Sequence, residues 1–366
     1  MLAYIVRRLL LIVPTIFGIM IINFAVVQVL PGGPVEQLIA QIQGRAVAAT
    51  ARVSGGGAGE VGGTTATTGG EDATYRGAQG LDPEFIADLE RTFGLDKPAG
   101  ERFLLMMERY LTFDFGESYF QSRSVVAIVL DKMPVSVSLG LWTTLLVYLI
   151  AVPLGIAKAV RDGSRFDVAT SIVIIVGQAI PSFLFAILLI VLFAGGSYFQ
   201  WFPLRGLTSP GFEDMAWYEQ VADYFWHLVL PMTALLVGSF ATLTMLTKNS
   251  FLEEINKLYV ATARAKGLSE RRVLYGHVFR NAMLIPIAGF PGAIISILFT
   301  SALLIEIIFS LDGLGLLGFE SVIRRDYPIM FATLYFFTLL GLVMRLAGDL
   351  IYVAVDPRID FERRAA

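Results

Sequence analysis

The chain alternates between long uncharged runs and short basic segments. Six windows lack charged side chains over close to the length that a transmembrane helix needs, which is about 20 apolar residues. In chain order they cover residues 9–30, 133–157, 168–204, 224–247, 281–305 and 327–344, the last continuing to 355. The pattern predicts an all-α integral membrane protein with six transmembrane helices. The third helix is expected over residues 168–194.

Composition supports a lipid environment. Of 366 residues, 55% are hydrophobic and 16% are charged, whereas soluble domains carry about 25% charge. The mean hydropathy is +0.68. The chain has no cysteine, which excludes disulfides, zinc ribbons, iron–sulfur clusters and thiol catalysis. Its two histidines, His227 and His277, are far apart and do not suggest a metal site.

The first uncharged run could belong to a cleaved signal peptide or to a retained helix. A signal peptide has a shorter apolar region, of about 7–15 residues, and a small-residue cleavage site. Residues 9–30 are longer and end in PGGP without such a site. We therefore expect a retained transmembrane helix.

The basic residues predict the orientation of the chain. Lys and Arg gather before the first helix, between the second and third, between the fourth and fifth, and at the C-terminus. With six spans all four segments fall on one side, which the positive-inside rule assigns to the cytoplasm. We expect a multi-pass protein of the bacterial inner membrane with both termini in the cytoplasm.

Four regions follow from these spans. Residues 1–31 hold the first transmembrane helix, and 32–134 form a segment on the outer side. Residues 135–355 hold the other five helices and a basic loop at 249–281, and 356–366 form a cytoplasmic tail. Within the outer segment, the Gly/Thr-rich stretch 54–70 is expected to be a disordered linker, and amphipathic helices are expected at 81–95 and 101–113.

The most basic stretch, KLYVATARAKGLSERRVLYGHVFR, spans residues 257–280. Good helix formers run to Lys266, Gly267 suits a left-handed helix stop, and Ser269 suits the N-cap of a second helix. The charges alone could be a topology signal or a lipid-binding helix. The small residues Ala261, Ala263 and Ala265 also allow another protein to approach closely, so a docking helix remains open beside the topology signal.

Charged residues within the spans are few. Arg345 and Asp349 are four apart on one helical face, which favours a structural ion pair over a transport site. The chain shows no Walker A motif, no H-E-x-x-H and no G-x-S-x-G, so no catalytic constellation is visible and a membrane enzyme is a distant third hypothesis. Because no clear proton-relay residue lies inside a span, uphill transport would draw its energy from another subunit.

Several stretches together resemble a known family. TARAKGLSERRVLYGHVFRNAML is similar to the cytoplasmic EAA-motif loop of permease subunits of bacterial ABC importers, and further matches are FGLDKP, DFGESY, IEIIFSLDGLGLLGFESVIRRDYP and GDLIYVAVDPRID. They resemble the B-type permeases of the dipeptide/oligopeptide binding-protein-dependent transport family. The N-terminus and the long outer segment look most like the Yej-type branch, which is associated with oligopeptides and peptide antibiotics such as microcin C.

The aligned loop departs from the motif at its glutamate and at its later leucine–proline positions, which are Phe279 and Arg280 here. The EAA positions fall on Ala261, Thr262 and Ala263, and the motif's glycine falls on Gly267, so the glutamate is missing. The resemblance implies a coupling helix that contacts an ATPase. The expected contact residues are Ala261, Thr262, Ala263, Arg264, Ala265, Lys266, Gly267 and Leu268.

The resemblance also implies the fold and the partners. The fold would be the type I ABC importer transmembrane fold, with 32–134 as a periplasmic insertion. The partners would be a second, homologous permease in a heterodimer, two ATPase subunits or one fused ATPase, a periplasmic substrate-binding protein, a peptide substrate and membrane lipid, with no nucleic acid. ATP and magnesium would bind the partner subunits, and this chain would bind no cofactor.

Two further expectations remain open. Glu306, Asp312 and Asp326 could line a periplasmic mouth that meets the cationic end of a peptide, or they could be ordinary loop acids. A stand-alone channel or secondary carrier for a small solute is the alternative function, and co-purification with an ATPase and a second permease distinguishes it.

Overall fold

The computed structural model describes residues 2–29, 33–42, 83–92, 94–196, 198–296 and 302–355. The described chain is helical, and its one β-bridge, Glu117 with Ser124, stands outside any strand. The linker expected at 54–70 and the tail at 356–366 lie outside the described residues. The chain divides into two compact units, which are described separately.

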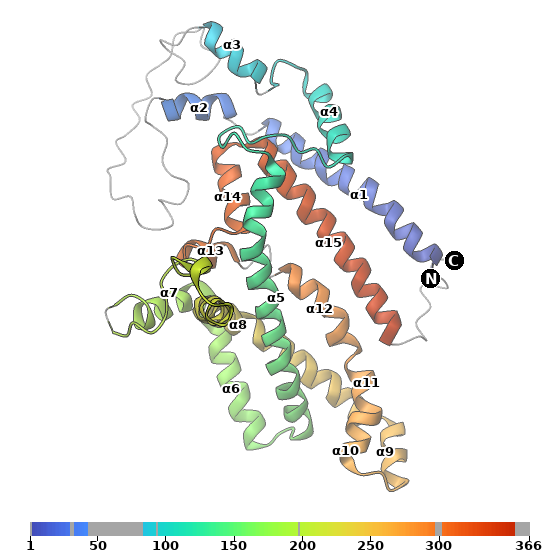
Figure 1. Cartoon of the computed structure of the whole chain (residues 1–366). Coiled ribbons are helices and arrows are strands. Elements are labelled where there is room, and N and C mark those ends of the chain that lie inside the picture. Colours follow the sequence, from blue (N-terminus) through green and yellow to red (C-terminus); the bar gives the residue numbers. More distant parts are fainter. Residues whose placement is uncertain are drawn as a thin grey trace. The chain divides into compact units, whose positions relative to one another are not determined.

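The first unit comprises Met1–Arg8, Pro134–Gly315 and Leu340–Ala366. Figure 1 labels its helices. They are most of α5 (Val125–Val160), α6 (Arg165–Ala179), α7 (Ser182–Phe193), α8 (Trp217–Ile255), α9 (Leu258–Ala265), α10 (Glu270–Val273), a π-helical turn (Leu274–Val278), α11 (Phe279–Ala282), α12 (Leu284–Ser296), α13 (Ala302–Ile308) and the second half of α15 (Tyr327–Val355).

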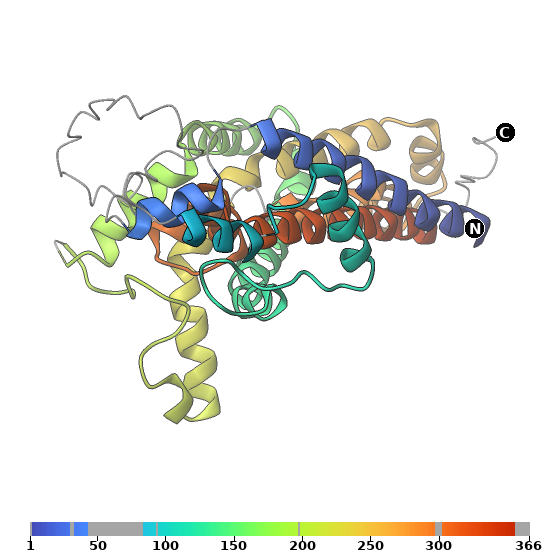
Figure 2. The same cartoon turned by 90° about the horizontal axis from the view of Figure 1, so that it is seen from above.

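Helices α5 and α8 cross closely in this unit, because a glycine lies at the crossing. A Cβ on Gly155 of α5 would lie 2.6 Å from Cβ of Thr247 and 2.8 Å from the carbonyl oxygen of Thr244, both on α8. Membrane helices associate through such small residues, since lipid gives no hydrophobic drive to their contact. The loop before α8 folds back on its first turns (Figure 2), where Asp223 accepts hydrogen bonds from Ser209.

The third span differs from the single helix expected over 168–194. It consists of α6 and α7, which meet at an angle of 92°. The break lies at Ile180 and Pro181: Ile180 has ψ of 119°, because the ring of a following proline clashes with a residue in helical conformation. The expectation of one helix was wrong at this point.

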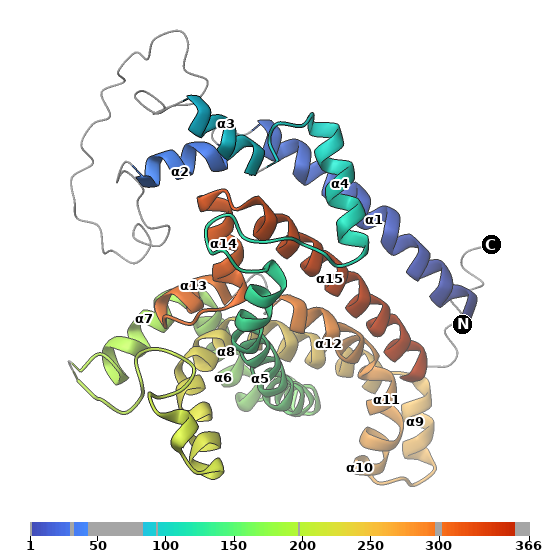
Figure 3. The ribbon, with the colours of Figure 1, turned by 45° about the horizontal axis from the view of Figure 1, so that its top comes forward.

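The second unit comprises Leu9–Met133 and Leu316–Leu339. Its helices are most of α1 (Leu2–Val29), α2 (Pro34–Ile42), α3 (Pro83–Thr92), α4 (Ala99–Leu111), the first turns of α5, most of α14 (Leu314–Arg324) and the first half of α15. Helices α3 and α4 match the two amphipathic helices expected in the outer segment. Figure 3 shows α4 lying against α1, where Phe103 contacts the rings of Phe17 and Phe24 at centroid distances of 5.6 and 5.3 Å.

The number of helices that could cross a membrane agrees with the number of spans that the sequence predicts. Within the described residues, four helices are long and apolar enough to cross a membrane: Tyr4–Val29, Val125–Val160, Trp217–Ile255 and Tyr327–Ile351. Two bent pairs, α6 with α7 and Glu270–Ala282 with Leu284–Ile295, bring the number to six if each is one span. The all-α membrane architecture is confirmed.

Candidate coupling loop

The basic loop forms a helical hairpin in which α9 and α10 lie side by side (Figures 1 and 3). Helix α9 ends in a Schellman motif: N–H of Leu268 donates to the carbonyl of Ala263 at 3.4 Å, and N–H of Gly267 donates to the carbonyl of Arg264 at 2.9 Å. Gly267 has φ of +79°, the left-handed conformation that glycine adopts without a steric penalty. The predicted helix–glycine–helix is confirmed.

Ser269 begins the second helix with less than the expected capping. Its backbone is extended, as an N-cap requires, but its side chain accepts no hydrogen bond from the helix. Arg264 compensates by joining the two arms of the hairpin. Its Nε and Nη2 donate to the two carboxylate oxygens of Glu270 at 2.9 and 3.1 Å, a bidentate geometry that fixes orientation as well as distance.

One face of the hairpin is buried within its own unit. Val260 and Ala263 pack with Phe251 of α8 and Ile156 of α5 in a shared apolar cluster. The hairpin therefore packs directly on the two longest helices of the unit, α5 and α8.

The opposite face is exposed. Leu258 at the start of α9 is 86% exposed, the most exposed leucine of the described chain. Of the eight residues predicted to contact a partner, six are exposed: Ala261, Thr262, Arg264, Ala265, Lys266 and Gly267. Ala263 is buried and Leu268 is half-buried, so these two support the hairpin from inside. Six of the predicted contact residues therefore form one exposed surface, and Ala263 and Leu268 lie beneath it.

A second network anchors the base of α9. Glu254, near the end of α8, accepts hydrogen bonds from Lys257 and from the hydroxyl of Tyr259, the latter at 2.7 Å. Asn281 of α11 donates to the same hydroxyl at 3.3 Å. These contacts hold the first residues of α9 against α8 and α11.

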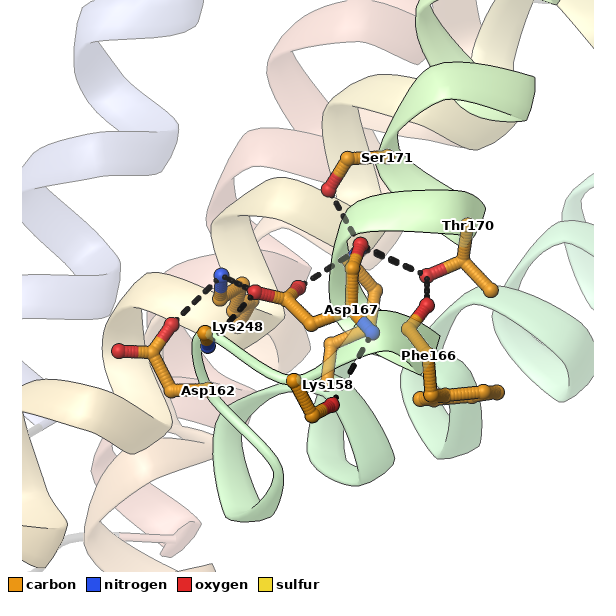
Figure 4. Close-up of polar contacts among 9 residues, drawn as sticks. Lys158, Asp162, Phe166, Asp167, Thr170, Ser171 and Lys248 are labelled. Carbon is orange, nitrogen blue, oxygen red and sulfur yellow. Dashed lines mark hydrogen bonds and ion pairs between the residues drawn. The ribbon is translucent and has the colours of Figure 1, made fainter.

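Buried charged side chains connect the C-terminal parts of α5 and α8 with the N-terminal end of α6 (Figure 4). Lys158 is fully buried. Its ammonium lies 2.9 Å from Oδ1 of Asp167 and donates to the hydroxyls of Thr170 and Ser171 and to the backbone carbonyl of Asp167. On the other side, Lys248 of α8 lies 2.7 Å from Oδ2 of Asp167.

Both oxygens of Asp167 lie beside an ammonium group, as a buried carboxylate requires. Oδ2 accepts hydrogen bonds from Lys248 and from N–H of Gly163, whereas Oδ1 is ion-paired with Lys158 but accepts no hydrogen bond from the described residues. Lys248 also pairs with the more exposed Asp162 at 2.8 Å. The network lies beside the hairpin core, because Ile156 and Ala159 flank Lys158 on α5 and Phe251 follows Lys248 by one turn on α8.

Sequence reasoning missed this network. Lys158 and Lys248 were counted only as topology charges, and Asp167 only as the border of a window. The available signal was the aspartate itself, which is three residues into a helix and lies at a membrane boundary next to a short basic loop. Across the described residues, no three His, Asp or Glu side chains converge as a metal site.

Comparison with known proteins assigns the chain to a family. Residues 151–361 match the family model described as "Binding-protein-dependent transport system inner membrane component". The chain belongs to this family. It is thus a multi-pass component of the inner membrane, and the family works with a binding protein, an ATPase and a partner permease.

Curated relatives cover the whole permease. It is 62% identical to "Peptidoglycan transport system permease protein YejB" of Agrobacterium fabrum over 99% of both chains. It is 57% identical to "Inner membrane ABC transporter permease protein YejB" of Escherichia coli O157:H7, over 99% of this chain and 100% of the relative. It is 30% identical to "Oligopeptide transport system permease protein AppB" of Bacillus subtilis, with the same coverage. A solved structure of the MetNI methionine ABC transporter aligns with a TM-score of 0.48 and 18% identity, over 63% of this chain and 97% of its own.

The three acids predicted at a periplasmic mouth have different surroundings in the permease. Glu306 is fully buried beneath Gly313 and Gly315 and accepts a hydrogen bond from Ser136 at 3.1 Å. Asp312 is exposed. A role at the mouth stays a prediction for all three.

Asp326, in the second unit, is buried. It accepts hydrogen bonds from the hydroxyl of Ser118 at 2.5 Å and from N–H of Tyr119 at 3.3 Å. Burial raises the pKa of its carboxyl group, and these hydrogen bonds oppose the rise. The contacts fix the loop before α5 to the start of α15.

The predicted ion pair between Arg345 and Asp349 is corrected by the structure. Asp349 pairs with Arg8 of α1 at 3.2 Å and accepts a hydrogen bond from the hydroxyl of Tyr4 at 2.7 Å. Among the described residues Arg345 is exposed and forms no ion pair with Asp349. A cation from a distant helix takes the place of the local i, i+4 partner.

Proposed function

We propose that this chain is the permease subunit of an ATP-driven peptide importer. It would form the translocation pathway with a second, homologous permease and receive peptides from a periplasmic binding protein. The relatives support this substrate class, because they include an oligopeptide permease and a peptidoglycan transport permease. Oligopeptides and peptide antibiotics are the proposed cargo.

The main support for the mechanism is the exposed face of the α9–α10 hairpin, whose opposite face is packed within its own unit. Leu258 offers an apolar contact, Ala261 and Ala265 allow close approach, and Lys266 offers a positive charge. Such a convex helical element fits a groove on a partner subunit. We assign that partner to a cytoplasmic ATPase, which would hold the ATP and magnesium as one fused chain or two.

Coupling would then run through packed side chains. ATP-driven closure of the ATPases would move the hairpin, and Val260 and Ala263 would transmit this movement to Phe251 on α8 and Ile156 on α5. Because α5, α6 and α8 share the Asp167 network, their ends would move together. The orientation proposed from the basic loops, with both termini and the hairpin in the cytoplasm, meets this requirement.

Co-purification tests the proposal. The tagged chain is extracted from its native membrane in mild detergent and its companions are identified by mass spectrometry. We expect a second permease and an ATPase, and we expect that the reconstituted complex accumulates peptide only with ATP and the binding protein. A chain that purifies alone and conducts solute without ATP would establish the channel or carrier alternative instead.

A further inference from the structure

The second unit contains a cavity of about 620 Å³, a volume typical of small-ligand sites. It lies among the end of α1, helices α3 and α4, the loop that leads to α5, and the start of α15. Charged and aromatic side chains line it together. The charged ones are Arg91, Lys97, Arg102, Arg109, Asp114 and Glu117.

Two of the cations are held by local carboxylates and two are not. Arg91 pairs with Asp88 at 3.5 Å and Lys97 with Glu101 at 3.3 Å. Arg102 and Arg109, seven residues apart on α4, have no carboxylate partner among the described residues. A spacing of two helical turns places both on the same face, about 10 Å apart along the axis.

Arg102 carries the clearest sign of a missing ligand. Its Nη2 donates to Gln28 on α1 at 2.8 Å, but its Nε is buried without a hydrogen-bond partner. A buried donor without a hydrogen-bond partner is destabilising, and more so when it is charged. An arginine can offer a carboxylate a parallel pair of donors from its guanidinium group, and Arg102 lines the cavity.

The remaining lining suits a short peptide better than an inorganic anion. Asp114 and Glu117 come from the loop before α5, whereas Arg102 and Arg109 come from α4, so the cavity has groups for both charged ends of a zwitterion. Phe24, Tyr110 and Phe331 add apolar walls. Burial raises the pKa of the lining residue Tyr119 to about 12.

We propose that this cavity binds the C-terminal carboxylate end of a peptide, with Arg102 as the primary anchor and Arg109 as the second cation. This site rests on the proposed function, since it assigns peptide cargo to a surface of the permease itself. It would give the permease its own selection for a free carboxylate, beyond that of the binding protein.

A cysteine probe tests binding without transport. Because the chain has no cysteine, Met106→Cys introduces a single thiol into the cavity wall, and Glu108→Cys, exposed on α4 outside the lining, is its matched control. Both are labelled in the purified full complex without ATP, with a maleimide, and labelling is read on this chain by gel. We expect tri-alanine to slow labelling of Met106→Cys at least threefold, tri-alanine amide to have no effect, and Glu108→Cys to be insensitive to both.

Arg102→Gln in the Met106→Cys background should abolish the protection, whereas Arg123→Gln, which removes a paired cation outside the cavity, should leave it intact. Equal protection by the acid and the amide would overturn the proposal. Protection by inorganic phosphate but not by tri-alanine would also overturn it, and would indicate a phosphate or lipid-headgroup site.

Measurements of peptide uptake provide a second test of the proposed site. In proteoliposomes with the binding protein, Arg102→Gln should lower uptake of tri-alanine at least fivefold relative to wild type and leave uptake of the amide within twofold. An equal loss for both substrates would show a structural role and contradict the site. If the wild-type complex transports neither peptide but tri-alanine still protects Met106→Cys, the proposed function fails while the site stands.

Discussion

Gly267 is the residue on which the shape of the hairpin depends. Its φ of +79° closes α9 and turns the chain into α10. For a residue with a Cβ this conformation is less stable by about 1–2 kcal/mol, and for a β-branched residue the difference is larger. No atom outside its neighbours lies within 4 Å of a Cβ built there, so the constraint comes from the backbone alone.

We therefore predict that Gly267→Val leaves the chain in the membrane at normal amounts but lowers ATP-dependent uptake at least tenfold. Peptide uptake and peptide-stimulated ATP hydrolysis of the reconstituted complex measure the effect. Gly267→Asn should retain more activity, because asparagine tolerates the left-handed region. Gly276→Ala, in the π-helical turn after α10 and with a negative φ, is the control. Normal uptake by Gly267→Val would contradict the coupling role.

Lys158 and Asp167 form a buried ion pair whose contribution to stability can be measured by mutation. Removing one partner of a buried pair typically costs about 3–5 kcal/mol, because the other charge is left uncompensated. We predict that Lys158→Met and Asp167→Asn each lower the free energy of unfolding by several kcal/mol, and that the double variant loses clearly less than the sum. Reversible unfolding in mixed micelles provides this double-mutant cycle.

The exposed pair between Arg123 and Asp131 is the matched control for that cycle. Both side chains are about half exposed, and such pairs contribute about 0–1 kcal/mol. Additive losses at Lys158 and Asp167 would show that the buried pair does not act as a unit.

Residue-scale features differed in how far the sequence revealed them. The stop at Gly267 was predictable, because a left-handed helix end is a local requirement with a known residue preference. The partner of Asp349 was not, because a local rule favoured Arg345 whereas packing brings Arg8 closer. The Asp167 network joins Lys248 across 81 residues of chain, a separation that no periodicity encodes.

At the scale of elements, the crossing of α5 and α8 leaves no room for a side chain at Gly155. A methyl group on Gly155 would meet the Thr244 carbonyl oxygen at 2.8 Å, and backbone cannot move aside as a flexible side chain can. We predict that Gly155→Ala destabilises the chain by about 1–3 kcal/mol, the usual cost of overpacking, as measured by unfolding in mixed micelles.

Gly177→Ala on α6 is the control for this crossing. Its new methyl group would lie 3.7 Å from Val237, an ordinary contact, and alanine favours helix over glycine by about 1 kcal/mol. Gly177→Ala should therefore be neutral or slightly stabilising. Equal effects at the two positions would contradict a close crossing at Gly155.

The elements themselves were largely predictable, since uncharged length and helix-stop signals mark them. The 92° bend between α6 and α7 was not predicted, although its cause, Pro181, is visible in the sequence. Proline within an apolar run can end a helix, as at Pro181, or lie within it, as Pro134 and Pro153 do in the unbroken α5. Tertiary contacts decide between these outcomes, so the sequence alone left the angle open.

At the scale of the whole molecule, the position of an exposed apolar residue indicates whether lipid or another protein is its natural neighbour. Exposed apolar residues along α1 and α6, such as Ile22 and Val173, lie within candidate spans, where lipid is the natural neighbour. Leu258 is different, because it stands in a basic hairpin between spans. An apolar side chain that is 86% exposed among Lys and Arg fits the proposed contact with a protein partner better than a contact with lipid tails.

We therefore predict that Leu258→Glu separates assembly from insertion. The variant should reach the membrane and unfold like wild type, since Leu258 buries almost nothing within the chain, but it should lose most of its co-purifying ATPase. Leu104→Glu is the matched control: Leu104 is also strongly exposed, but it lies on α4 in the segment proposed to be periplasmic. That control should retain the ATPase, because a cytoplasmic partner cannot reach it. Retention of the ATPase by Leu258→Glu would contradict the docking of α9. Its loss in both variants would point to general damage by the introduced charge.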